Sequence, residues 1–216
     1  MNKPFVVYGA RGSGSVAVEA ALTLLGLPYE VVEREAWKPK DSELMAAVNP
    51  LRQVPALILP SGELLTESAA MLIWLADLYP QARMSPGLND PKRPAFLRWM
   101  SFVSSQIYSL YWIRDDPSRL ADDEANQALV RERTMARIAD CWRMMGAQIT
   151  PGRYLLGDDL SVLDLYVTVV SRWGPRRARF CQDSPAMGEV VDRVDKDPRL
   201  AALWDERFPF TGKYAL

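Results

Sequence analysis

The sequence predicts an α/β half followed by an all-helical half, and three observations indicate this division. Short β-branched and aromatic runs, typical of strands, occur only before residue 80, where they alternate with helical patterns. Residues 81–91 are rich in proline and turn-forming residues, as a linker is. Beyond them, apolar residues recur only at helical spacing. We therefore expect one domain at residues 1–80, a linker at 81–91 and a helical domain at 92–216.

The first half is predicted to run β-α-β-α-β-β-α. Residues 4–8 have the length and composition of a buried strand, and the dense apolar run at 16–25 predicts a buried helix. Gly26 should end that helix, since glycine is favoured just after a helix. A second strand is expected at 29–33, so these elements form a right-handed βαβ unit. The remaining predicted elements are a weak helix at 41–47, strands at 56–59 and 63–66, and a helix at 67–78.

The helical half begins with two long amphipathic stripes. Apolar residues recur at helical spacing over residues 92–115 and again over 122–149. Ser184-Pro185 and Asp197-Pro198 each place a capping residue before a proline at the first helical position, which indicates a helix start. Shorter helices are therefore expected at 161–173, 185–195 and 198–207.

Composition narrows the possible chemistry. The chain contains no histidine, which excludes Ser-His-Asp and Cys-His catalysis and nearly all zinc-enzyme sites, so no metal is expected. The net charge of −1 gives no global field for nucleic acid or an anionic membrane, and neither is an expected partner. Cys141 and Cys181 are isolated and are interpreted as core residues. With no signal segment or membrane span in the pattern, we expect a cytoplasmic protein.

Residues 49–68 carry the strongest functional signal. Proline cannot donate to a sheet ladder, so Pro55 at the start of a strand belongs at an edge or beside a ligand. A cis Val54-Pro55 bond would expose the N–H and C=O of Val54 to an extended peptide. Glu67 and Ser68 add an acceptor and a hydroxyl at a helix start whose N–H groups can bind a carboxylate. The stretch suits a small peptide with an ammonium and a carboxylate, and a plain hairpin with a capped helix is the alternative.

The chain resembles the cytosolic glutathione S-transferases, of bacterial type and uncertain class, over nearly its full length. Besides the stretch from 49 to 68, residues 24–30 resemble the family's link from the first helix to the second strand. Residues 156–164 resemble its buried capping box, in which Ser161 caps a helix and Asp164 reaches back as a folding element. The resemblance implies a thioredoxin-like N-terminal domain and a helical bundle domain that carries the second-substrate site.

The resemblance also assigns binding roles to residues of this sequence. Val54 would pair with the cysteinyl part of glutathione, the expected co-substrate. Glu67 and Ser68 would hold the γ-glutamyl ammonium and carboxylate. The other residues expected to bind glutathione, at the bend or near the glycyl end, are Pro55, Gln53, Arg52, Trp37 and Lys38.

The glutathione thiol must ionise to become a good nucleophile, and an ordinary thiol has a pKa of about 8.5. A hydroxyl at a helix N-terminus can stabilise the thiolate. The family's usual serine position falls on Gly12, and the cysteine position of a bacterial class falls on Gly14. Ser13 is therefore our first catalytic candidate and Ser15 the second, with the backbone N–H groups of Gly14 or Ser15 as an alternative. The other side chains considered for this role are Tyr8 and Arg11.

The second substrate would bind where the helical half faces this loop. The candidates for its pocket are aromatic or basic: Arg11, Tyr108, Tyr111, Trp112, Arg114, Trp173 and Arg176. Because an aromatic stripe is usually core, we expect two or three of them to line the pocket. Four arginines crowd residues 172–179, and we interpret them as a solvated basic rim. Binding of an anionic co-substrate or of a partner subunit's acids is the alternative.

The leading hypothesis is a glutathione transferase whose thiolate attacks a small, apolar electrophile. Two alternatives remain at this point: a glutathione-dependent peroxidase or disulfide reductase, and a non-catalytic glutathione-binding regulatory protein that kept the fold. A homodimer is implied by the resemblance, with the helix at 67–78 against a partner's long helix.

Overall fold

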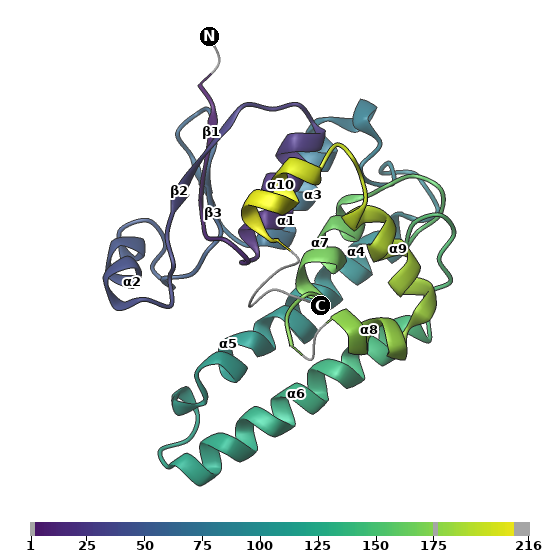
Figure 1. The fold of residues 1–216 in the computed structure, drawn as a ribbon. Coiled ribbons are helices and arrows are strands. Elements are labelled where there is room, and N and C mark those ends of the chain that lie inside the picture. The colour runs from purple at the N-terminus through teal and green to yellow at the C-terminus, as the bar shows by residue number, and fades with distance from the viewer. Residues whose placement is uncertain (1–2, 175–176, 210–216) are drawn as a thin grey trace.

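The computed structural model describes residues 3–174 and 177–209 (Figure 1). Its sheet has the strand order β2-β1-β3-β4. β1 pairs in parallel with β2 and antiparallel with β3, so the sheet is mixed, as in a thioredoxin-like domain. The strands are β1 (Phe5–Gly9), β2 (Tyr29–Glu33), β3 (Ala56–Ile58) and β4 (Leu64–Leu65).

Helices lie on both sides of these strands. α1 (Ser15–Leu24) and α3 (Ser68–Leu78) pack against each other on one side, and α2 (Pro39–Ala46) lies on the other (Figure 1). Gly26 has a φ of +65° just after α1, which confirms the predicted helix end, because few residues with a Cβ adopt this conformation.

The alternation of β1 decides which of its side chains face α1. Phe5, Val7 and Gly9 are buried, whereas Val6 and Tyr8 are only partly buried. Phe5 and Val7 join the same apolar cluster as α1. Successive strand residues point to opposite faces, so the Tyr8 side chain points away from α1.

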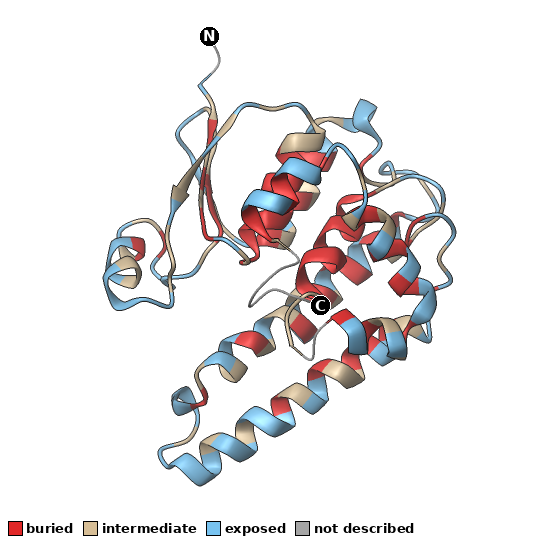
Figure 2. Cartoon of the chain, in the orientation of Figure 1, coloured by how far each residue is buried: buried red, intermediate tan, exposed pale blue. Residues whose placement is uncertain are grey.

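The stripe at 92–115 forms one continuous helical rod with a change of winding in its middle. α4 (Arg93–Phe102) continues into a π-helical segment, η2 (Val103–Tyr108), and then into α5 (Ser109–Asp115). The antiparallel arm of α5 and α6 (Glu124–Gly146) extends from the rest of the molecule, and its far end is exposed (Figures 1 and 2). The other helices are η1 (Pro80–Ala82), η3 (Pro117–Arg119), α7 (Val162–Val170), α8 (Arg177–Asp183), α9 (Pro185–Asp195) and α10 (Ala201–Arg207).

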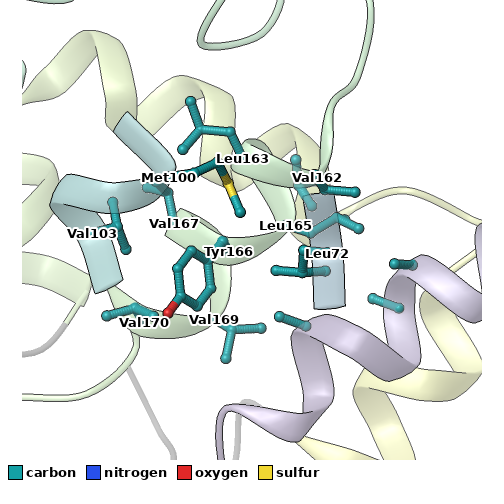
Figure 3. Close-up of a cluster of buried hydrophobic side chains, with 14 of the residues drawn as sticks. Leu72, Met100, Val103, Val162, Leu163, Leu165, Tyr166, Val167, Val169 and Val170 are labelled. Atoms are coloured by element: carbon teal, nitrogen blue, oxygen red, sulfur yellow. The ribbon is translucent and has the colours of Figure 1, made fainter. Parts of the chain in front are cut away.

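α7 is the central helix, and all its residues are buried. Figure 3 shows Tyr166 of α7 beside Val103, with Leu72 of α3 close to the same helix. α7 packs against α1 and α3 of the first half and against α4 and α9 of the second. The two halves therefore share one apolar core. In the described part of the chain, no helix combines the length and apolar character that a bilayer span requires.

The predicted capping box opens α7. Ser161 donates from its backbone N–H and from its hydroxyl to Oδ2 of Asp164, at 2.8 and 2.7 Å. The N–H of Leu155 donates to Oδ1 of the same carboxyl at 2.8 Å. Burial raises the pKa of Asp164 to about 6, although all three donors favour the carboxylate. The box is confirmed, and Asp164 also anchors the loop before it.

The helices of the C-terminal region differ from the prediction at two points. α10 begins at Ala201 and not at Pro198, because Asp197 instead accepts a hydrogen bond from the N–H of Arg199 at 3.0 Å, which closes a turn. α8 was not among the helices predicted with bounds.

The interpretation of residues 172–179 as a solvated basic rim is wrong for two of its arginines. Arg172 and Arg177 share the carboxylate of Asp195, each at 2.5 Å, with side chains only 2% and 4% exposed. A buried guanidinium needs a counter-charge, and the end of α9 supplies one. Arg176 lies outside the described residues.

Candidate functional site

The bend before β3 lies beside the end of β1. The Val54-Pro55 bond is cis, as predicted. The antiparallel register that pairs Tyr8 with Ala56 carries Pro55 towards Gly9. Within the described residues, the N–H and C=O of Val54 make no hydrogen bond. An extended peptide could therefore pair with Val54 as a strand pairs with a sheet edge.

The loop before this bend is braced from within. Asn49 is buried, and its side-chain amide donates to the C=O of Gln53 at 3.0 Å and accepts from the N–H of Leu51 at 3.1 Å. Arg52 adopts a left-handed φ of 55° in the same loop. Arg52 and Gln53 are exposed, so a defined loop carries these two predicted binding residues to the surface.

The start of α3 carries the predicted pair Glu67 and Ser68. Glu67 is exposed and has a φ of 64°, which is uncommon for a residue with a Cβ and often marks a functional site. Ser68 is buried, and its hydroxyl lies 3.0 Å from the hydroxyl of Tyr166 in α7. Sequence reasoning missed Tyr166, because nothing local indicates a contact across 98 residues.

The loop between β1 and α1 holds both predicted catalytic serines in an internal network. The hydroxyl oxygens of Ser13 and Ser15 accept from the N–H of Ala10 at 3.2 and 3.3 Å. Ser15 donates its hydroxyl proton to Oε1 of Glu19 at 2.8 Å. The two hydroxyl oxygens are 3.0 Å apart, so Ser13 is the donor between them. Both serine hydroxyls therefore have hydrogen-bond partners inside the protein.

Glu19 connects this network to the C-terminal helix. Nε of Arg207, in α10, lies 2.7 Å from Oε2 of Glu19, with side chains 7% and 0% exposed. Burial raises the pKa of Glu19, and Arg207 opposes this rise. Arg207 also pairs with Glu33 at 3.0 Å, and its C=O accepts from the N–H of Gly12 at 2.8 Å.

Sequence reasoning missed both members of this buried ion pair. Glu19 could have been found, because a single acidic residue inside the apolar run at 16–25 indicates a buried carboxylate that needs a partner. No local pattern indicated Arg207, which is 188 residues away in the chain.

Three predicted pocket aromatics meet beside the loop. Trp173 donates from Nε1 to the C=O of Gly12 at 2.8 Å. Its ring lies 4.9 Å from that of Tyr108 and 5.0 Å from that of Tyr111. Tyr111 is buried and donates to the C=O of Gly174 at 2.6 Å. Tyr108 and Trp173 therefore form an aromatic wall at the start of α1, whereas Tyr111 is buried behind Trp173.

The other predicted site residues lie farther out. Trp112 is 44% exposed, with the guanidinium of Arg119 stacked on its ring at 4.4 Å. Arg114 lies over the ring of Tyr111 at 4.7 Å. Arg11 is exposed and donates from its N–H to Glu33 at 3.1 Å. Trp37 and Lys38 are exposed in the segment between β2 and α2, where Lys38 pairs with Glu35.

Neither cysteine belongs to this site. Both are unpaired thiols, and burial raises the pKa of Cys141 and of Cys181. Each is therefore a weaker nucleophile than an ordinary thiol at neutral pH. The described residues also contain no group of three or more acidic or cysteine side chains placed to hold a metal ion.

Comparison with known proteins agrees with this geometry. Residues 7–83 match the family model "Glutathione S-transferase, N-terminal domain". The GST-like protein YncG of Escherichia coli K12 is 29% identical over 196 residues, which cover 90% of this chain and 94% of that protein. Maleylacetoacetate isomerase of Rattus norvegicus is 30% identical over 169 residues, covering 76% and 74%.

A solved structure extends the likeness to the whole fold. A glutathione transferase homologue from Sulfitobacter, crystallised with bound glutathione, superposes with a TM-score of 0.81 and 27% identity, covering 95% of this chain and 99% of that one. Sequence and structure thus agree across both halves, and the chain belongs to the glutathione S-transferase family.

Proposed function

We propose that the protein is a glutathione transferase that binds glutathione along the bend before β3 and activates its thiol for attack on a small, apolar electrophile. The observation that carries the proposal is that, within the described residues, the N–H and C=O of Val54 make no hydrogen bond, at the end of the sheet where β1 leads into α1. A sheet edge of this kind pairs with an extended peptide, and the helix start next to it favours an anion.

The tripeptide would extend from the start of α3 to the loop before the bend. Its γ-glutamyl group would meet the carboxylate of Glu67 and the hydroxyl and N–H groups at Ser68. Its cysteinyl part would pair with Val54. Gln53 and Arg52 would lie near the glycyl carboxylate, with Trp37 and Lys38 on the same outer side. This arrangement directs the sulfur towards residues 12–15.

Binding alone would not accelerate the reaction, because catalysis requires the thiolate to be bound more tightly than the thiol. The start of α1 contributes by its dipole. The wall of Tyr108 and Trp173, backed by the buried Tyr111, would present apolar surface to the electrophile beside the sulfur, with Arg11 at the rim. An apolar electrophile suits such a wall better than a charged one.

A non-catalytic glutathione-binding protein is the second candidate, and one observation favours it. The hydroxyls of Ser13 and Ser15 both have hydrogen-bond partners inside the protein, Ser15 and Glu19. For Ser13 to stabilise a thiolate, its proton would have to turn away from Ser15.

Glutathione titration separates the two candidates. Calorimetry would measure binding, ultraviolet thiolate absorbance near neutral pH would measure ionisation, and a nitro-activated aryl halide would serve as the test electrophile. We expect binding, a thiolate signal and turnover. S-methylglutathione is the control, since it should bind without any thiolate signal. Binding of glutathione without thiolate would favour the binding protein, and no binding would contradict both candidates.

We also propose a homodimer that uses α3 against a partner's long helix. Leu78 at the end of α3 and Leu97 of α4 are 49% and 41% exposed, which leaves apolar surface for a second copy. Light scattering should give twice the mass of the chain, and the mass of a single chain would contradict this proposal.

A further inference from the structure

The loop between β1 and α1 uses its own donors internally. The N–H of Gly12 donates to the C=O of Arg207 at 2.8 Å, and that of Ser13 to the C=O of Ala10 at 3.1 Å. The N–H of Ser15 donates to the hydroxyl oxygen of Ser13 at 3.3 Å. Both serine hydroxyls have partners inside the protein as well, so a donor from another part of the chain would stabilise a thiolate here without breaking this network.

Tyr108 brings a hydroxyl to that position from the helical half. A Cβ added to Gly14, the residue that caps α1, would lie only 2.1 Å from Oη of Tyr108. The phenol oxygen thus occupies the space into which a side chain at position 14 would project. The ring packs 4.9 Å from Trp173, and the hydrogen bond from Trp173 to Gly12 holds both aromatic rings against the loop.

The Tyr108 hydroxyl is suited to donate. The nearby N–H of Gly14 acts to lower the pKa of this phenol. In residues 3–174 and 177–209, no atom accepts its proton. Burial raises the pKa of this phenol above its ordinary value, so the group keeps its proton. It can therefore act as a hydrogen-bond donor but not as a base at neutral pH.

The backbone that carries Tyr108 departs from regular helix. Tyr108 is the last residue of the π-helical segment η2, between α4 and α5. Such segments change the direction of the side chains that follow and occur frequently at functional sites. Here the segment delivers a hydroxyl across the boundary between the halves.

We propose that Tyr108 is a catalytic residue whose hydroxyl donates a hydrogen bond to the glutathione sulfur. The thiol proton leaves to water, and Tyr108 retains its own proton. The sulfur electron pair then forms the carbon–sulfur bond while the leaving group departs with its bonding pair. This inference rests on the proposed function and identifies which group stabilises the thiolate.

The test is the pKa of the bound thiol, measured by thiolate absorbance against pH at saturating glutathione. In Tyr108→Phe, loss of a hydrogen bond to an anion should raise that pKa by about one to two. kcat/KM at neutral pH should fall about tenfold or more, while the glutathione Kd should change only a few-fold, because the rest of the tripeptide keeps its contacts. Tyr79→Phe is the matched control, since Tyr79 lies just beyond the far end of α3. It should leave the thiol pKa unchanged.

Gly14→Ala tests the role of the Tyr108 hydroxyl by displacing it while leaving Tyr108 itself in place. Gly14 has helical φ and ψ, so alanine fits the backbone, but its methyl group would displace Oη of Tyr108. The thiol pKa should rise here too, and this variant decides the matter if circular dichroism shows Tyr108→Phe unfolded.

Two results would overturn the inference while leaving the proposed function intact. One is a wild-type protein that lowers the thiol pKa together with variants Tyr108→Phe and Gly14→Ala that lower it equally. The other is a rise confined to Ser13→Ala or Ser15→Ala. A wild-type protein that does not bind glutathione would overturn the proposed function and this inference together.

Discussion

Ser68 has two partners in the proposed complex, the glutathione carboxylate and the Tyr166 hydroxyl 3.0 Å away. Ser68→Ala should weaken glutathione binding by about tenfold, because a hydrogen bond to a charged group contributes about 1.5–3 kcal/mol. Tyr166→Phe removes only the internal partner, and should reduce binding less while lowering the free energy of unfolding by about 1 kcal/mol. Calorimetry and urea unfolding would measure the two effects. Equal losses of affinity would show that Ser68 acts through Tyr166 and does not touch glutathione.

Residues with a local signal were predictable from the sequence, whereas residues that act through distant contacts were not. Pro55 follows a valine at a strand start, Gly26 follows an apolar run, and Ser161 precedes Asp164 by three positions, so neighbours alone identify each one. The internal hydrogen bonds of the Ser13 and Ser15 hydroxyls depend on Glu19, which accepts from Ser15. Glu19 in turn pairs with Arg207, which lies on a helix formed by residues 201–207. Sequence reasoning therefore found the place of the chemistry but not its hydrogen-bond partners.

At the scale of elements, the start of α7 should make stability depend on pH. Burial raises the pKa of Asp164 from 3.8 to about 6, so the folded state binds this proton more tightly than the unfolded state. Its contribution to the free energy of unfolding is largest below pH 4 and falls as the pH rises from about 4 to 6. The total change is about 3 kcal/mol.

Asp164→Asn removes this titration. The difference in unfolding free energy between wild type and variant, from urea melts at several pH values, should decrease from pH 4 to pH 6 and then stay level. Measuring the difference cancels the carboxyls whose pKa is lowered, such as Asp77 beside Arg93, since these act in the opposite direction. A difference that does not vary with pH would contradict the assignment.

The docking of α10 on α1 rests on a buried charge pair. Arg207→Met should lower the free energy of unfolding by about 3–5 kcal/mol, because it leaves Glu19 buried without its counter-charge. Replacing both residues, as Glu19→Met with Arg207→Met, should recover most of the loss. Lys196→Met is the control, because Lys196 makes an exposed pair with Asp192 and its loss should cost less than about 1 kcal/mol. A double variant as unstable as the single one would show that packing of Arg207, and not charge, holds the helix.

Element positions were predicted well wherever periodicity and caps agree. The second strand was expected at 29–33 and lies at Tyr29–Glu33, and the helix expected at 185–195 lies at Pro185–Asp195. The π-helical segment Val103–Tyr108 was not predictable, because an apolar stripe at helical spacing does not distinguish α from π winding. That segment positions Tyr108, the residue proposed to stabilise the thiolate. The proposed catalytic group therefore lies where hydrophobic periodicity does not reveal the type of helix.

At the scale of the whole molecule, the two halves should unfold together. α7 packs against helices of both halves, Tyr166 meets Ser68, and Trp173 meets Gly12 across the boundary. A continuous apolar core of this kind does not separate into independent units. Urea unfolding followed by tryptophan fluorescence and by far-UV circular dichroism should therefore give one coincident transition.

Glutathione binding provides a second test of whether the two halves unfold together. The proposed site places nearly all of the tripeptide on the first half, whereas α6 and α8 belong to the second. Because a ligand that binds only the folded state stabilises everything that unfolds with its site, glutathione at 100 times its Kd should raise the unfolding free energy by about 2.7 kcal/mol. Hydrogen exchange in the globally unfolding parts of α6 and α8 should slow to the same extent as in α1 and α3. Two separate transitions, with glutathione shifting only that of the first half, would show that the shared core does not couple the halves.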